Sequence, residues 1–307
     1  MTSSEVTRTQ ETLRFRIIIA FAAVYLVWGS IYLAIRFAIE TIPPLLTAGM
    51  RNVIAGPLLY AWVRRSGGPR PTRRQWLAAI IAGGLLLLGG NGLVTWAEKR
   101  VSSGLTALLV ATVPLWMVVL DWVFLRASRP SPKVFLGLAL GLVGIVLLIG
   151  PADLLGEHRV DLVGAGMVLL AALFWSIGSL YAKRAPLPDP PLLGTSMEMI
   201  GGGVLLLLAS GIKGEWGQVD FAAVSVSSWL ALAYLTALGS IVGFTAYTWL
   251  LRVTTPARVS TFAYVNPVVA MLLGWAVGGE TLTAQMLLAA VVIICAVVLI
   301  TTGRTEG

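Results

Sequence analysis

Polar residues divide this chain into ten apolar stretches, and each stretch has about the length of a helix that crosses a lipid bilayer. A spanning helix needs about 20 apolar residues to cross roughly 30 Å of hydrocarbon. The stretches are residues 16–37, 45–63, 76–97, 104–125, 133–150, 161–183, 192–212, 227–251, 258–278 and 284–302. Their connections leave no room for a soluble domain. The pattern therefore predicts an all-α membrane protein with ten transmembrane helices, whose immediate partner is the lipid bilayer.

The composition excludes several classes of protein. Hydrophobic residues make up 57% of the chain and charged residues 12%, whereas soluble domains carry about 25% charged residues. The single cysteine, Cys295, and the single histidine, His158, argue against a disulfide framework, a metal centre or a Ser-His-Asp triad. None of the GxSxG, HExxH, P-loop or CxxC motifs occurs. We therefore expect no enzyme activity, no cofactor and no metal.

The net charge of +8 reports membrane topology rather than nucleic-acid binding, because the basic residues form short clusters between apolar stretches. Lysine and arginine accumulate in the cytoplasmic loops of membrane proteins. With the N-terminus inside, 16 of these residues lie on the cytoplasmic side and 5 outside, and Arg51 lies within a helix. We expect a multi-pass protein of the inner (plasma) membrane with both termini cytoplasmic and no nucleic-acid partner.

The chain also contains an internal repeat. Trp28 and the pair Pro43-Pro44 recur as Trp175 and the pair Pro190-Pro191, at an offset of 147 residues. A second block recurs at an offset of 153 residues: Trp96 with Trp249, Pro114 with Pro267, and Trp122 with Trp275. Two ordered blocks predict a repeat of five helices, residues 1–150 and 151–307. Because five is an odd number, the two copies lie in opposite orientations across the membrane.

Inverted repeats are typical of secondary transporters, in which two similar halves enclose a site near the midplane. An ancestral duplication in a channel or a membrane enzyme would leave the same pattern. A channel or passive facilitator of the same architecture is therefore the alternative function, and a membrane enzyme that acts on lipid is a weaker third one.

Several motifs resemble the EamA family of the drug/metabolite transporter superfamily, most closely its inner-membrane branch. They are Val27–Tyr32 followed by Pro43-Pro44, Gly90–Gly92 leading to Ala97-Glu98, Ala111–Pro114, Ala263–Val268 and Gly278–Leu282. The resemblance covers nearly the whole chain. It implies ten helices in two inverted repeats, and the transport, usually the export, of small metabolites or amino acids.

The repeated and helix-weakening positions are the candidates for a substrate cavity. Aromatic rings with one polar edge suit a cavity that holds amphipathic solutes weakly, and a proline inside a helix frees a carbonyl at depth. The predicted cavity residues are Trp28, Tyr32, Asn91, Trp96, Pro114, Trp175, Trp249, Tyr264, Asn266 and Pro267.

Charged residues inside the membrane are costly and call for partners. Arg51 lies about six residues into its helix, about 9 Å below the outer interface, and its repeat mate Glu198 lies equally deep from the inner face. Glu98 and Arg252 end helices at matching depths. We therefore predict two gating ion pairs, Arg51 with Glu98 and Glu198 with Arg252. Helix-end packing or snorkelling is the alternative reading. If protons drive transport, Glu98 and Glu198 are the candidate carriers.

Together these patterns predict an exporter of small amphipathic metabolites or amino acids that works by alternating access around a midplane cavity. The sequence leaves the substrate, the coupling ion, the direction of transport and the oligomeric state open.

Overall fold

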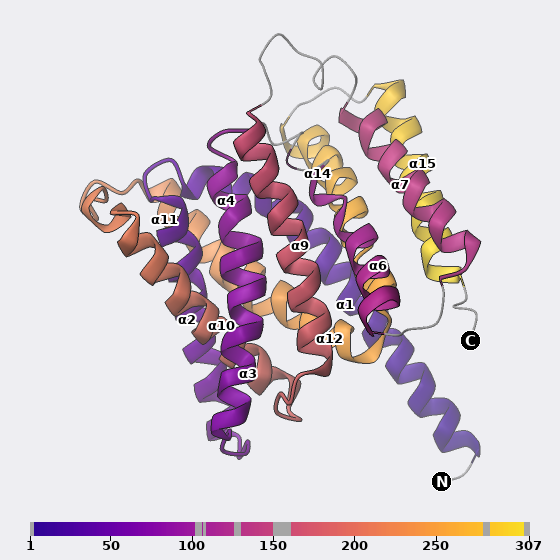
Figure 1. The fold of residues 1–307 in the computed structure, drawn as a ribbon, viewed down its shortest axis with the longest axis horizontal. Coiled ribbons are helices and arrows are strands. Elements are labelled where there is room, and N and C mark those ends of the chain that lie inside the picture. Colours follow the sequence, from indigo (N-terminus) through magenta and orange to yellow (C-terminus); the bar gives the residue numbers. More distant parts are fainter. Residues whose placement is uncertain are drawn as a thin grey trace.

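A computed structural model of the chain describes residues 3–101, 106, 109–125, 130–149, 161–278 and 283–303. The described residues form helices with short connections and contain no strand. The helices before residue 150 are α1 (Ser3–Ala38), α2 (Pro44–Arg65), α3 (Arg73–Gly83), η1 (Gly84–Gly92), α4 (Leu93–Ala97), α6 (Val113–Leu125) and α7 (Pro132–Ile149). The later ones are α9 (Leu162–Arg184), α10 (Pro191–Ile212), η2 (Glu215–Gly217), α11 (Val226–Tyr234), η3 (Leu235–Phe244), α12 (Thr245–Val253), α13 (Pro256–Val259), α14 (Phe262–Gly278) and α15 (Ala284–Thr302). Figure 1 shows them packed into one bundle.

Five helical segments of the described residues are long and apolar enough to cross a membrane. They are Thr12–Ile31, Arg73–Ala97, Leu162–Arg184, Pro191–Ile212 and Val226–Val253, and shorter apolar helices cover Val113–Phe124, Pro132–Leu147 and Ala284–Ile300. Large apolar side chains such as Phe15, Leu58 and Phe124 are exposed on the outside of the bundle. In a soluble protein, an exposed apolar surface of this kind would promote aggregation. The fold is that of an all-helical membrane protein.

Local sequence sets where several helices begin. Pro44 starts α2 at a position where its missing N–H costs nothing. Thr72 and Gln75 form a capping box at the start of α3. Asp161 caps α9 by accepting a hydrogen bond from the Gly164 N–H at 2.9 Å. That bond, together with Arg100 Nη1 at 3.2 Å, holds the pKa of Asp161 below its usual range.

Two of the long segments change to π-helix in their middle. η1 interrupts Arg73–Ala97, and η3 interrupts Val226–Val253. Both are rich in glycine, and π-helical turns are frequent at functional sites. An offset of 153 residues carries η1 onto residues 237–245, so the two π-helices occupy nearly equivalent positions in the predicted repeat.

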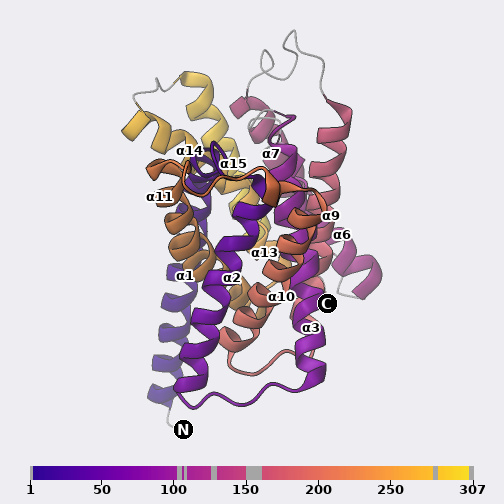
Figure 2. The same cartoon turned by 90° about the vertical axis from the view of Figure 1, so that its left-hand side faces the viewer.

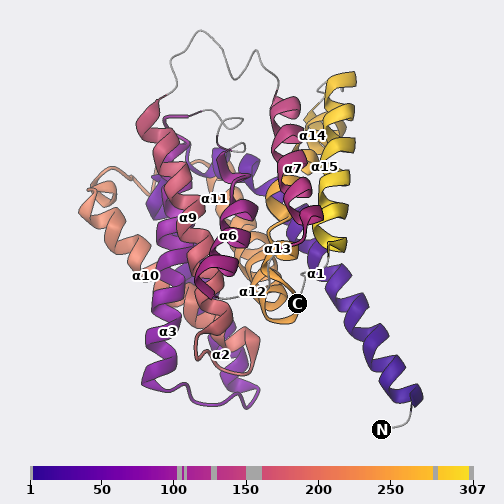
Figure 3. The same cartoon turned by 45° about the vertical axis from the view of Figure 1, so that its right-hand side comes forward.

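Helices that the predicted repeat pairs also pack against each other. α2 packs along α10, and α7 packs along α15. Figure 2 shows α2 beside α10, and Figure 3 shows α7 and α15 side by side at one edge of the bundle. α10 also contacts α3, where a Cβ atom on Gly83 or Gly202 would meet the backbone of the facing helix. The glycines at this contact therefore permit close helix packing.

The structure corrects one sequence inference in the first half of the chain. The apolar stretch 104–125 predicts one continuous span with Pro114 inside it, but α6 begins only at Val113. Pro114 therefore lies in the first turn, where a helix needs no N–H donor, and it frees no carbonyl within α6. By contrast, Pro267 does lie inside α14, as the sequence predicts.

The start of α1 and the end of α15 lie toward the same end of the bundle. In Figure 1 the N-terminus of α1, the end of α15 and the connection from α2 to α3 all point downward, whereas the connection between α1 and α2 is at the top. The connection from α2 to α3 contains Arg70 and is flanked by Arg64, Arg65, Arg73 and Arg74. One end of the bundle is therefore strongly basic.

Candidate functional site

A cavity lies in the centre of the bundle. Its walls come from α1, α2, η1, α4, α6, α9, η3 and α14 and include the segment between α4 and α6 at Val110. Both π-helices contribute, through Leu87, Gly90 and Asn91 of η1 and through Gly239, Ser240 and Phe244 of η3. Segments far apart in the sequence thus meet around one space.

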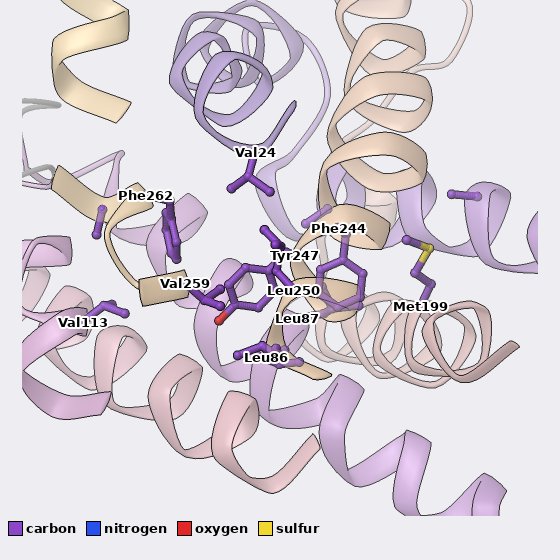
Figure 4. Close-up of a cluster of buried hydrophobic side chains, with 14 of the residues drawn as sticks. Val24, Leu86, Leu87, Val113, Met199, Phe244, Tyr247, Leu250, Val259 and Phe262 are labelled. Atoms are coloured by element: carbon purple, nitrogen blue, oxygen red, sulfur yellow. The ribbon is translucent and has the colours of Figure 1, made fainter. Parts of the chain in front are cut away.

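Aromatic side chains form one side of this cavity. The Trp28 ring lies 5.5 Å from that of Trp175 and 4.9 Å from that of Phe262 between centroids, in edge-on geometry in both cases. Behind them lies Tyr247, which is fully buried and 5.0 Å from Trp28. Figure 4 shows Tyr247 between Phe244 and Phe262. We call Trp28, Trp175, Phe244, Tyr247 and Phe262 the aromatic cluster.

Hydrogen bonds fix the aromatic cluster. Trp175 Nε1 donates to Tyr247 Oη at 2.8 Å, and Ser179 Oγ donates to the Trp175 carbonyl at 2.6 Å. Because Ser179 has a single proton, the 2.5 Å contact between its Oγ and Tyr247 Oη must be a bond that the tyrosine donates. The three residues form a closed chain that holds the Trp175 ring against the cavity.

Polar side chains line the rest of the cavity at Arg51, Asn52, Asn91, Ser240 and Asn266. Asn52 Nδ2 donates to the Ala48 carbonyl at 2.8 Å, and its Oδ1 accepts from Ser240 Oγ at 3.3 Å. The other three differ. Arg51 Nε and the Oδ1 atoms of Asn91 and Asn266 are buried and have no hydrogen-bond partner.

Four of the predicted cavity residues line this space: Trp28, Asn91, Trp175 and Asn266. They come from α1, η1, α9 and α14, so both predicted halves contribute. The side chain of Tyr32 lies outside the part of the structure that is described.

Five other predicted cavity residues, Trp96, Pro114, Trp249, Tyr264 and Pro267, lie outside the described lining. Trp96 lies under the cation of Lys213, whose Nζ is 4.1 Å from the ring centroid. Tyr264 is buried between helices and donates to the Leu138 carbonyl at 3.2 Å. Trp249 packs against the hydrophobic core. Trp249 and Tyr264 therefore contribute to helix packing in this conformation.

Neither predicted ion pair is closed in this conformation. The salt bridges among the described residues join Arg100 to Asp161 at 3.2 Å and Arg184 to Asp121 at 3.0 Å. Arg51 makes no such contact with Glu98. Arg252 is close enough to act electrostatically on Glu198, but its Nη1 donates to the Pro188 carbonyl at 3.0 Å. Glu198 is 1% exposed, and its Oε2 has no hydrogen-bond partner.

Sequence reasoning missed Asn52, Ser240, Phe244 and Phe262 as cavity residues. The repeat itself contained a signal for one of them, because the 153-residue offset carries Asn91 onto Phe244. Asn52 follows Arg51 directly, but nothing in its own type distinguishes it from a polar residue at a helix contact. Nothing in the sequence distinguishes Ser240, and its place at the cavity is known only from the structure, where it donates a hydrogen bond to Asn52.

Comparison with known proteins identifies the class of this bundle. The profile of the EamA-like transporter family matches residues 15–150 and 162–302. The chain belongs to the EamA-like transporter family. It is 43% identical to the uncharacterized inner membrane transporter YedA of Escherichia coli (strain K12), over 93% of this chain and 90% of that protein. It is 27% identical to the uncharacterized transporter YoaV of Bacillus subtilis (strain 168), over 92% and 95%.

Two further comparisons concern an efflux pump and a solved structure. The chain is 27% identical to a probable amino-acid metabolite efflux pump of Salmonella typhimurium, over 88% of this chain and 89% of that protein. A crystal structure matches with a TM-score of 0.75 at 21% identity, over 93% of this chain and 97% of that one, which shows a shared fold. The protein is a membrane transporter and not an enzyme.

Proposed function

We propose that this EamA-like protein exports small amphipathic metabolites or amino acids by alternating access around the central cavity. The observation that carries the proposal is the cavity itself, which is enclosed by repeat-related elements. Trp28 and Trp175 contact each other in its wall, and η1 and η3 both line it. A site between two similar halves can be exposed to either side in turn when one half rocks against the other.

The proposed architecture is ten spans in two inverted five-helix halves, residues 1–150 and 151–307. Support comes from the two separate matches of the family profile and from the equivalent positions of the two π-helices. The packing of α2 on α10 and of α7 on α15 also fits, because elements close to a pseudo-two-fold axis contact their own mates.

We further propose that the protein lies in the inner membrane with both termini in the cytoplasm. The basic end of the bundle and the name of the Escherichia coli relative support this orientation. It can be tested by labelling Ser66→Cys and Asp220→Cys in a Cys295→Ser background with a membrane-impermeant maleimide. Intact cells should label position 220 and spare position 66, and the opposite pattern would refute the topology.

In this orientation the cavity lies on the outer side of the aromatic cluster. α1 starts at the inner end, so that Ile31 and Ile35, which line the cavity, lie farther out than Trp28. Arg51 lies two turns from the outer start of α2. The aromatic cluster thus forms the inner barrier. Arg51 with Glu98 would close the outer side in the opposite state. The aromatic cluster forms the inner barrier without the Glu198–Arg252 pair, because no salt bridge among the described residues joins these two side chains.

The proposal separates a carrier from a channel by experiment. Metabolites that accumulate outside cells that overexpress the protein, compared with cells that express Trp175→Ala, identify a transported solute. Proteoliposomes loaded with that solute should then show saturable uptake of labelled solute that unlabelled solute on the far side stimulates. Flux that rises linearly with concentration and shows no trans-stimulation would favour the passive facilitator and overturn alternating access.

A further inference from the structure

Arg51 is the only charged residue in the described lining of the central cavity. Its side chain belongs to a residue that is 6% exposed, and its Nε has no hydrogen-bond partner. No salt bridge among the described residues involves it. A buried guanidinium without a counter-ion is costly in a membrane. Its position at the wall of a cavity means that an anion from solution can supply the missing partner.

Glu215 is a buried charged residue with a structural role, and it provides a comparison for Arg51. Glu215 is also 6% exposed, but its Oε2 accepts from the Leu46 N–H and from Ser210 Oγ, each at 2.9 Å. These bonds join the connection after α10 to the start of α2, away from the cavity. Arg51 lacks such internal bonds, although the Asn52 side chain next to it is fully engaged. The contrast favours a ligand-binding role for Arg51.

Two further orphan atoms lie around the same space. Asn91 Oδ1 and Asn266 Oδ1 are buried, unpartnered and part of the cavity lining. Amide oxygens accept hydrogen bonds, so they complement a donor such as a hydroxyl or an amine. The cavity thus offers one cationic fork for an anion and two acceptors for a neighbouring donor.

The apolar part of the lining determines the rest of the ligand. Trp28, Trp175, Phe244 and Phe262 all belong to the cavity lining, and the rings of Trp28, Trp175 and Phe262 contact one another. Such a wall accommodates an apolar or aromatic body. A phosphate or a sulfate would leave it in contact with water.

We propose that the central cavity binds a small organic carboxylate whose apolar body lies against the aromatic cluster. Arg51 pairs with the carboxylate, and Asn91 and Asn266 accept a hydrogen bond from a donor beside it. The assignment rests on the proposed function, because it names the class of solute that the transport cavity takes. Arg51 suits this task because its planar fork matches a carboxylate in a bidentate manner.

Three matched probes test the assignment on the purified full-length protein. Phenyllactate carries a carboxylate, a hydroxyl and a phenyl ring; 3-phenylpropionate lacks the hydroxyl, and phenyllactamide lacks the charge. Affinity is measured by titration calorimetry and by quenching of tryptophan fluorescence. A charged hydrogen bond contributes enough to change affinity by about tenfold or more. We expect phenyllactate to bind at least about tenfold more tightly than phenyllactamide, with 3-phenylpropionate between them.

Variants assign this preference to residues. Arg51→Gln should reduce the ratio between phenyllactate and phenyllactamide to about one, and Arg51→Lys should retain part of it. Arg36→Gln is the matched control, because it removes the same charge from an exposed position in the last turn of α1, and its ratio should equal that of the wild type. Asn91→Ala should remove the advantage of phenyllactate over 3-phenylpropionate.

Equal binding of phenyllactate and phenyllactamide to the wild type would overturn the proposal. This comparison uses the wild-type protein alone, so it tests the proposal even if Arg51→Gln does not fold. A charge preference that persists in Arg51→Gln would overturn it as well. The outcome is separable from the transport mechanism. Carboxylate-selective binding without carrier flux in proteoliposomes would refute only the proposed function, whereas trans-stimulated transport without carboxylate preference would refute only this inference.

Discussion

Replacing Tyr247 by Phe tests whether the aromatic cluster orients the cavity wall. The change removes one oxygen from a fully buried side chain and leaves its ring in place. Tyr247 Oη accepts from Trp175 Nε1 at 2.8 Å and donates to Ser179 Oγ at 2.5 Å. Without it the indole N–H loses the only partner that it has among the described residues, whereas Ser179 keeps its bond to the Trp175 carbonyl.

The expected loss of stability follows from the one buried donor, Trp175 Nε1, that the substitution leaves without a partner. Leaving a buried donor unsatisfied costs about 1–3 kcal/mol, which corresponds to a decrease in the unfolding temperature of about 2–4 °C per kcal/mol in a chain of 150–250 residues and somewhat less here. Because the Trp175 ring lines the cavity, its freer rotation should also weaken substrate binding. Thermal unfolding in detergent and uptake into proteoliposomes measure the two effects.

Tyr264→Phe is the matched control. Tyr264 is also fully buried and makes one hydroxyl bond, to the Leu138 carbonyl at 3.2 Å, but it lies outside the cavity lining. It should lose less stability than Tyr247→Phe, because no buried donor is left unsatisfied, and the apparent substrate affinity should stay at the wild-type value. If Tyr247→Phe and Tyr264→Phe change transport equally, or if neither changes it, the inferred role of the hydrogen-bonded chain at Trp175 is refuted.

Three further predictions concern the gates, the helix contacts and a helix cap. Arg51→Glu and Glu98→Arg should each reduce uptake, and the double variant should recover part of it, since opposite charges face each other again when the outer side closes; absence of any recovery would contradict an outer ion-pair gate. Gly83→Val should destabilise the protein by about 1–3 kcal/mol or more, because its side chain would meet the backbone of α10. Gly166→Val should melt as the wild type does, because a Cβ atom at Gly166 would have no heavy atom of the surrounding structure within 4 Å. The lowered pKa of Asp161 stabilises the fold above the ordinary aspartate pKa, and this contribution should be lost as the pH falls through the lowered value; melting curves of Asp161→Asn should lack that part of the pH dependence, and identical profiles would show that the cap contributes nothing.

The positions of the long helices could be predicted from hydropathy because lipid imposes a length on an apolar run. The predicted stretch 192–212 agrees with α10 (Pro191–Ile212), and 227–251 agrees with the continuous segment Val226–Val253. Hydropathy cannot show how the backbone winds within such a run, so the change to π-helix at η1 and η3 was not predicted. It also cannot show the turn at Ala111 and Thr112 just before α6, since both residues lie within the apolar run.

The sequence predicted those cavity residues that occur at matching positions in both repeats and whose aromatic rings carry one polar group, as Trp28 and Trp175 do. The same rule failed to distinguish Trp96 and Trp249, because repetition marks a position in each half and does not say which face of the helix meets the cavity. Arg51 was identified by the cost of its charge, but it was assigned to a pair with Glu98. Only the structure shows that its Nε has no partner and that it borders an open space.

The central claim is that one cavity is exposed alternately to the two sides of the membrane. A single cysteine at Asn91, in a Cys295→Ser background, places a reporter in the cavity lining without touching the aromatic cluster. Its labelling by an impermeant maleimide is measured from the outside in intact cells and from the inside in inverted vesicles, with and without a transported solute. The account predicts labelling from both sides, with the solute shifting the balance so that one rate rises as the other falls. Labelling from both sides at rates whose ratio the solute leaves unchanged would contradict alternating access and indicate a continuous pore.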